Sequence, residues 1–243
     1  GAWNEEEQHI SPLLGLLAKI VEDDCAERDA AAGTDRGLVL ARLDFEILGT
    51  VAITPFEVRT EIVRPGRTIE LVQAVASQDG RDAVILRAWL LKPIDSSAVA
   101  GHAFPPIPAR EDMEEFDPRG LWPGGFIDSI AEGRVRAIEP GHAQVWARTD
   151  VELVEGEAQS DATGFVGMFD LANGLSARAA REEVLFPNVD LTAHLFRQPR
   201  GKWVGYEVRQ NFGAEGIGLT ETVLYDDDGP IGTMSQILTV RPR

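Results

Sequence analysis

One carboxylate interrupts an otherwise apolar stretch of the chain. In SDATGFVGMFDLANG, residues 160–174, Ser160 is placed to cap a helix and Asp161 falls in its first turn, where negative charge is favoured. The apolar side chains that follow lie on nearly every side of such a helix, which is typical of a buried helix. Asp170 is therefore expected to be buried. Because burial raises the pKa of a carboxyl group, Asp170 is a candidate to act as a base or to hold a water molecule.

The neighbours of Asp170 leave two roles open for it. On a helix it would share a face with Val166, Gly167, Asn173 and Gly174. Each glycine costs about 1 kcal/mol relative to alanine, so something is expected to approach this face closely. That something could be a substrate. By themselves the residues favour the plainer role, a hydrogen bond to the backbone or to Asn173, because buried polar groups are usually satisfied within the fold.

Composition narrows the classes of function. The 243 residues are 44% hydrophobic, and 40 acidic against 23 basic side chains give a net charge of −17, which argues against nucleic acids and anionic membranes as partners. No apolar run is long enough to span a membrane, and the acidic start GAWNEEEQH lacks a signal core, so we expect a cytoplasmic protein. The single Cys25 fits a reducing compartment. The histidines are scattered, so no metal site is predicted. The sequence has no phosphate-binding glycine motif, so no nucleotide cofactor is predicted.

The order of predicted elements repeats. Residues 10–32 predict a long helix, with Ser11 as N-cap, Pro12 in the first turn and Gly33 after its end. Alternating apolar residues predict antiparallel strands at 37–48, 56–63, 68–77 and 83–91. After a proline-rich connection at 94–128, strands at 135–138 and 144–154 precede the helix that begins at Ser160, and strands follow at 191–196, 203–211, 217–225 and 231–240.

Landmarks of the two halves differ by one constant offset. Ser11 and Ser160 are 149 residues apart (160 − 11), as are the turn pairs Asp79-Gly80 and Asp228-Gly229 (228 − 79). A helix followed by an antiparallel meander, present twice, indicates an internal duplication into two α+β domains.

The same stretches carry a family resemblance. VDLTAHLFRQPRGKWVGYEVRQ and GIGLTETVLYDDDGPIGTMSQILTV, together with ARLDFEILG and EVRTEIVRPGRTIELVQAVASQDGR in the first half, resemble the double-hotdog acyl-CoA thioesterases of the thioesterase II type. The resemblance covers nearly the whole chain apart from the linker. It implies an α+β double hotdog, in which each long helix is wrapped by a bent antiparallel sheet. The expected parts are an N-terminal hotdog at 1–95, an acidic linker at 96–129 and a C-terminal hotdog at 130–243.

The family's site implies three polar groups that hold and activate a water. Its helix aspartate matches Asp170, and its C-terminal glutamine matches Gln236, which shares a strand face with Met234 and Leu238. Where the family has threonine, this chain has Asn188, and Thr192 is the alternative. The equivalent position in the first half falls near Val21, so one site per chain is expected.

The resemblance also implies the ligand. The expected substrate is an acyl-CoA or acyl carrier protein thioester, bound without a cofactor or metal, in a protein that could form a homo-oligomer. The acyl chain would lie among Leu17, Phe165 and Met168. Backbone N–H groups near Gly167 or Asn173 could polarise the thioester carbonyl, and Arg197 or Arg200, beside a Pro-Gly bend, could receive phosphate. For either arginine alone, an ordinary solvated turn charge is the simpler interpretation.

Two other functions stay open on the same fold. One is a non-catalytic protein that binds acyl thioesters or lipids, which the asparagine in place of threonine keeps in view. The other is a hydratase or dehydratase acting on enoyl-CoA. Such an enzyme pairs an acidic residue with a histidine across the site, and the sequence places no histidine there; His194 is given a structural role.

Overall fold

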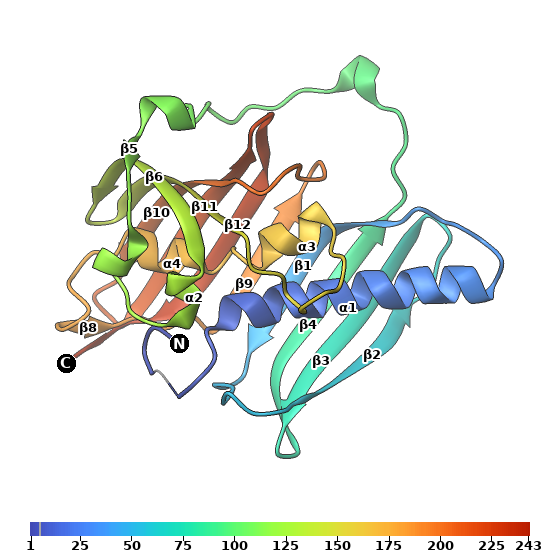
Figure 1. Ribbon diagram of the computed structural model, residues 1–243, viewed down its shortest axis with the longest axis horizontal. Helices are drawn as coiled ribbons and strands as arrows, with labels where there is room; N and C mark the ends of the chain where they lie inside the picture. Colours follow the sequence, from blue (N-terminus) through green and yellow to red (C-terminus); the bar gives the residue numbers. More distant parts are fainter. Residues whose placement is uncertain (5) are drawn as a thin grey trace.

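One large antiparallel sheet runs through the whole molecule (Figure 1), in a computed structural model that describes residues 1–4 and 6–243. Its eleven strands lie in the order β2-β3-β4-β1-β9-β12-β11-β10-β7-β6-β5, and β8 and β13 form a separate pair. The strands are β1 (Val39–Ile47), β2 (Glu57–Arg64), β3 (Ile69–Gln78), β4 (Arg81–Leu91), β5 (Glu114–Glu115), β6 (Ile130–Glu139), β7 (His142–Thr149), β8 (Val184–Leu185), β9 (Asp190–Leu195), β10 (Val204–Phe212), β11 (Ile217–Asp226), β12 (Gly229–Thr239) and β13 (Arg241–Pro242). The α-helices are α1 (Ile10–Ala31), α2 (Gly125–Asp128), α3 (Asp161–Val166) and α4 (Leu171–Leu175).

The two halves of the chain meet at one strand pair. Strands β1 and β9 are antiparallel, with Leu43 opposite Ala193 and Asp44 opposite Thr192. The offset of 149 makes Leu43 equivalent to Thr192 (43 + 149) and Asp44 equivalent to Ala193 (44 + 149). Each residue therefore pairs with the equivalent of its neighbour in the chain. At this pair the offset of 149 relates the two strands by an approximate two-fold rotation, and the duplication of the whole unit stays a prediction. The domain boundaries at 95 and 129 stay a prediction.

The predicted first helix is confirmed and begins at residue 10 as expected, but its N-cap is not the predicted one. His9, not Ser11, is the N-cap, and its ring Nδ1 accepts a hydrogen bond of 3.2 Å from the backbone N–H of Ser11. Ser11 lies in the first turn and is fully buried, and its hydroxyl oxygen accepts a hydrogen bond from a residue of the second half. The far end is as expected: Ala32 caps the helix and Gly33 follows at a φ of +63°.

The second helix is broken, so the prediction of one helix through residue 174 is wrong. Ser160 caps α3 as expected, through its hydroxyl and the N–H of Thr163, but α3 ends at Val166 and α4 begins only after Asp170. The broken segment lies against α1. A Cβ built on Gly15 would lie 2.7 Å from the Cα of Gly167, so the two helices cross with their backbones in contact. Glycine thus permits the close approach of a helix.

This crossing leads to a stability prediction. We expect Gly15→Ala to lower the free energy of unfolding by about 1–3 kcal/mol, since the new methyl group overpacks the contact with Gly167. Urea unfolding followed by circular dichroism measures the change. Gly101→Ala is the matched control, because nothing lies within 4 Å of a Cβ there. Equal stability of the two variants would contradict the proposed reason for the glycine.

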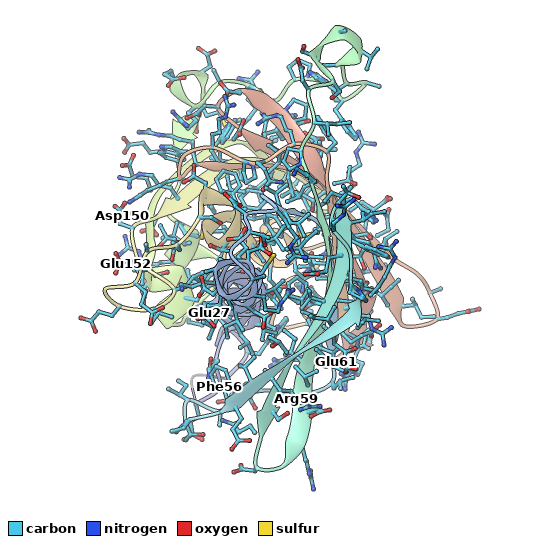
Figure 2. All side chains as sticks on the ribbon, turned by 90° about the vertical axis from the view of Figure 1, so that its right-hand side faces the viewer. Glu27, Phe56, Arg59, Glu61, Asp150 and Glu152 are labelled. Atoms are coloured by element: carbon cyan, nitrogen blue, oxygen red, sulfur yellow. The ribbon has the colours of Figure 1, made fainter. Side chains whose placement is uncertain are left out.

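The linker follows the second half of the sheet. Pro105 and Pro108 offer their carbonyl oxygens to Tyr225 Oη at 2.8 Å and Trp146 Nε1 at 3.0 Å. Further on, β5 pairs with β6, so the later part of the predicted connection extends the sheet. Figure 2 views the molecule along α1, with Arg59 and Glu61 on the outer strand of the first half and Asp150 and Glu152 on the loop after β7. Strand β7, which was predicted to run to residue 154, ends at Thr149.

Buried side chains of both halves form one continuous core between the helices and the sheet. In the described part of the chain, no helix combines the length and the apolar character needed to cross a membrane.

Candidate active site

Asp170 lies at the break between α3 and α4 and is 7% exposed. Its Oδ1 accepts hydrogen bonds from Asn188 Nδ2 at 2.9 Å and from Gln236 Nε2 at 2.7 Å. Its backbone N–H donates to the hydroxyl of Ser11 at 3.1 Å, so α1 of the first half fixes the break in the second. The structure therefore brings together the three residues predicted to hold a water.

Strand geometry explains why Gln236 and Asn188 reach Asp170. Gln236 shares the inner face of β12 with Met234 and Leu238, all three at most 2% exposed. Asn188 precedes β9 and bridges to Leu238, so it stands next to Gln236 at the same end of the sheet. The amide of Asn188 also donates to the carbonyl oxygen of Asp190 at 3.1 Å, which fixes its orientation.

The protein environment tunes the Asp170 carboxyl group toward neutral pH. Burial raises its pKa to about 7, and the hydrogen bonds from Asn188 and Gln236 oppose only part of that rise. No cation pairs with it within hydrogen-bond distance among the described residues. A carboxylate with such a pKa can accept a proton near neutral pH and can also give one up.

His9 is a residue of the site that the sequence analysis did not place there. Its Nδ1 lies 3.9 Å from Asp170 Oδ2, and its ring packs on Phe126 with centroids 4.2 Å apart. Burial lowers the pKa of His9 to about 3, so the imidazole is neutral at neutral pH. Because Nδ1 accepts from Ser11, the ring hydrogen belongs on Nε2. The expectation that no histidine faces Asp170 is therefore wrong.

Thr192, the alternative to Asn188, is not brought to Asp170. Along β9, Leu191 and Ala193 are buried on the inner face, and Thr192 lies on the other face. There its hydroxyl donates to Asp44 Oδ1 at 2.7 Å.

The two arginines predicted to receive phosphate lie beyond the opposite end of β9 from Asn188. Arg197 binds both carboxylate oxygens of Asp226, and Arg200 pairs with Asp228 at 3.3 Å. Their part in substrate binding stays a prediction. Both guanidinium groups are paired with aspartates and lie away from Asp170.

Gly167 and Asn173 do not offer free amide hydrogens to a ligand, contrary to expectation. The N–H of Gly167 donates to Thr163 O at 3.0 Å, and that of Asn173 to Asp170 O at 3.3 Å, because both continue the helical turns. The side chain of Asn173 instead joins a buried polar cluster with Gln210 and Thr220. Gly167 lies where the end of α3 packs against Gly15 of α1.

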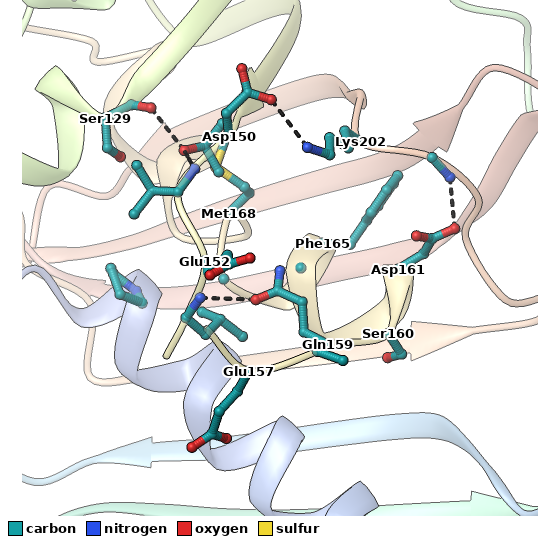
Figure 3. Close-up of a pocket in the computed structure, with 18 of the residues that line it drawn as sticks. Ser129, Asp150, Glu152, Glu157, Gln159, Ser160, Asp161, Phe165, Met168 and Lys202 are labelled. Atoms are coloured by element: carbon teal, nitrogen blue, oxygen red, sulfur yellow. Dashed lines mark hydrogen bonds and ion pairs between the residues drawn. The ribbon is translucent and has the colours of Figure 1, made fainter. Parts of the chain in front are cut away.

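Two cavities meet at Asp170 and His9, and a third lies nearby. A slot of about 30 Å³ is bordered by Asp170, His9 and Asn173 among aromatic rings. A cleft of about 230 Å³ is bordered by Asp170, His9 and Asn188. The third cavity, of about 320 Å³, lies beside α3 and the loop after β7 (Figure 3). It contacts Phe165 and Met168 but not Asp170, and Leu17, the third expected acyl contact, is buried in the core.

The continuous antiparallel sheet, with few helices, defines a hotdog-type fold. Over 99% of this chain and 89% of the other, the structure superimposes on a hot dog fold protein from Alicyclobacillus acidocaldarius with a TM-score of 0.73 and 14% identity. An acyl-CoA thioesterase II from Mycobacterium marinum gives a TM-score of 0.67 at 17% identity, over 93% and 91% of the two chains. These likenesses establish the fold.

The sequence itself establishes the family. Residues 1–91 match the model of the acyl-CoA thioesterase N-terminal domain, and residues 101–240 match that of the acyl-CoA thioesterase C-terminal domain. The chain therefore belongs to the acyl-CoA thioesterase family and is a thioester hydrolase. No curated protein matched the sequence.

Proposed function

We propose that this protein is a double-hotdog acyl-CoA thioesterase in which Asp170, held by Gln236 and Asn188, activates the water that cleaves the thioester. The observation that carries the proposal is the one-sided bonding of Asp170. Both amide donors bind Oδ1, which leaves Oδ2 with no closer partner than His9 Nδ1 at 3.9 Å among the described residues. Because Asp170 borders two cavities, a water in either of them can donate a hydrogen bond to this free oxygen.

Gln236 presents a second acceptor for the same water. Its Oε1 is buried and has no hydrogen-bond partner in the described part of the chain, while its Nε2 binds Asp170. A water that donates one hydrogen to Asp170 Oδ2 and the other to Gln236 Oε1 would have its oxygen lone pairs directed away from both. That is the orientation needed to attack a carbonyl carbon.

The proposed reaction then follows from the ionised form of Asp170. The carboxylate takes a proton from the water as the water oxygen bonds to the thioester carbon, and the carbonyl becomes an oxyanion. Collapse of the oxyanion breaks the carbon–sulfur bond, and the proton on Asp170 is available to the departing thiolate. The products are a free acid and a thiol.

The first turn of α1 is the proposed place for the oxyanion. Helix N-termini have unpaired amide hydrogens, and α1 begins beside Asp170 through the Ser11 contact. Ser11 uses its N–H on His9, and Pro12 has none. The donor that borders the 230 Å³ cleft is therefore Ile10.

Asn188 is proposed to act through its hydrogen bond to Asp170. We expect Asn188→Thr to keep kcat/KM within about tenfold of the parent, because a hydroxyl can also donate to the carboxylate. Asn188→Val has the same shape as threonine without the donor and should lose about ten- to a hundredfold. Steady-state kinetics of the pair measure the difference, and equal activity of the two variants would remove Asn188 from the mechanism.

Hydration of a double bond is a second candidate, and His9 is the observation that favours it. A histidine 3.9 Å from a carboxylate, contributed by the other half of the chain, is the pairing expected of a hydratase. The low pKa of His9 and its use of Nδ1 as an acceptor leave only the Nε2 hydrogen for chemistry. His9 therefore fits a positioning role better than that of an acid.

One assay separates these functions. Acyl-CoA thioesters of several chain lengths are incubated with the protein and free thiol is followed, while crotonyl-CoA is monitored for loss of its double bond. We expect thiol release with multiple turnovers and no hydration. Hydration without thiol release would support the second candidate, and binding without either reaction would support a non-catalytic acyl-binding protein.

A further inference from the structure

Asp170 stands between two cavities that differ about eightfold in size. The smaller, called here the aromatic slot, has a volume of about 30 Å³ and is bordered by Ala2, Trp3, His9, Trp122, Ile127, Asp170, Leu171, Asn173, Gly174 and Phe186. The larger, called here the carrier cleft, has a volume of about 230 Å³. A thioester cleaved at Asp170 has an acyl group on one side of the carbonyl and a carrier on the other, so the two cavities have two different parts to receive.

The walls of the aromatic slot are held in place. Trp122 is 7% exposed, and its Nε1 donates to the carbonyl oxygen of Gly174 at 2.9 Å. A Cβ on Gly174 would lie 2.7 Å from that same nitrogen, so the indole packs directly on the α4 backbone. Trp3, Trp122 and Phe186 contact each other edge-on, with centroids 4.8 to 5.8 Å apart. Widening the slot would break the hydrogen bond and these ring contacts.

The carrier cleft is larger, and both apolar and polar residues border it. It is bordered by residues of the N-terminal segment, by 47–51 at the end of β1 and beyond it, and by 187–188 before β9. Asn4, Gln8 and Thr50 are polar residues on its border, which also includes Glu7 and several apolar residues. Amide and hydroxyl groups of this kind suit the amide-containing arm that links the thiol of coenzyme A or of a carrier protein to the rest of the carrier.

We propose that the aromatic slot receives the acyl group and the carrier cleft receives the thiol-bearing arm, so that the enzyme acts on short-chain acyl thioesters. This assignment rests on the proposed thioesterase function. A cavity of about 30 Å³ admits the equivalent of about two water molecules, which corresponds to two or three carbon atoms beyond the carbonyl. Trp122 is then the residue that limits chain length, and Gly174 is present because Trp122 must approach α4.

The 320 Å³ cavity is the alternative place for an acyl chain. It has room for a long chain, and Phe165 and Met168 give it an apolar floor. However, it does not border Asp170, and Glu152 and Asp161 place carboxylates in its wall (Figure 3). An acyl chain that used it would be long, so chain-length preference distinguishes the two cavities.

The test is a chain-length series on the purified protein. Values of kcat/KM for acetyl-, butyryl-, hexanoyl-, octanoyl- and palmitoyl-CoA are measured with a thiol reagent. We expect acetyl- or butyryl-CoA to be favoured over octanoyl-CoA by at least about tenfold. Preference for octanoyl- or palmitoyl-CoA would overturn the assignment. Absence of thiol release from every substrate would instead contradict the proposed function itself.

Substitutions in the aromatic slot test whether its residues set the chain-length preference. Trp122→Ala should bring hexanoyl- and octanoyl-CoA to within about threefold of butyryl-CoA, a loss of most of the discrimination. Trp3→Ala also opens the slot, from a side chain that is 38% exposed and borders the carrier cleft as well, so it provides a second variant if Trp122→Ala does not fold. Trp203→Ala is the control, because that indole packs under Arg110, away from the slot. An unchanged short-chain preference in both slot variants would show that the aromatic rings do not set chain length.

Discussion

Replacing Asp170 with asparagine is expected to lower kcat/KM by about a hundredfold to ten-thousandfold, the range that a positioned general base contributes. Asparagine has nearly the same shape, and its oxygen can still accept from Asn188 and Gln236, so the site should keep its geometry. What is lost is the group that takes the proton. Thiol release from acyl-CoA measures the effect. Asp161→Asn, the same change in the same segment at a residue that accepts from the backbone of Gly201, should keep full activity.

The same substitution should raise stability as it removes activity. A carboxyl group whose pKa is raised on folding binds more protons in the folded than in the unfolded state, so it costs stability as the pH rises above its unfolded pKa near 3.8. With a folded pKa of about 7, that cost reaches roughly 2–4 kcal/mol above neutral pH. Asp170→Asn is therefore expected to gain stability at pH values near 8 and to gain almost none near 4. Loss of stability at both values would mean that Asp170 is mainly a structural residue.

The second large effect is the pH dependence of hydrolysis. If ionised Asp170 is the base, kcat/KM should fall about tenfold for each unit of pH below its pKa of about 7, and it should level off above that value. His9 adds no second transition in this range, because burial keeps its pKa near 3. Rates measured on a substrate that is stable over the range give the profile.

Gln236→Met checks that the transition belongs to Asp170. Removing the amide donor removes an interaction that lowers the pKa of Asp170, so the midpoint of the profile should move to higher pH. A profile that is flat between pH values of about 5 and 8, or a midpoint that Gln236→Met leaves in place, would contradict the role of Asp170 as base.

Much of the site was predictable from the chain because it rests on local patterns. The apolar context of Asp170 predicted its burial, and strand alternation put Gln236 on one face with two apolar residues; the family resemblance was needed to choose the inner face. Asn188 needed the family resemblance, since nothing in its own neighbours marks it. His9 was missed because its contact with Asp170 joins residues 161 positions apart (170 − 9), and only the packing of α1 against the second half brings them together.

The fold was predicted to a similar extent and for similar reasons. Helix α1 and the main strands follow hydrophobic period and turn residues, which act over a few positions. The break between α3 and α4 lies where Gly167 contacts the backbone of Gly15, and no local pattern reports such a contact. The glycines that suggested an open patch for a ligand are instead packed against α1 and Trp122. The possible homo-oligomer stays a prediction.

The central claim is that Asp170 activates a water and does not itself attack the thioester. A single turnover in water enriched in the heavy isotope of oxygen, with enzyme in excess over acyl-CoA, tests it most directly by mass spectrometry of the acid and of the peptide that contains Asp170. Direct attack by water predicts a labelled acid and an unlabelled peptide in the first turnover. An unlabelled acid together with a heavier Asp170 peptide would show a covalent acyl-enzyme and would contradict the proposed mechanism.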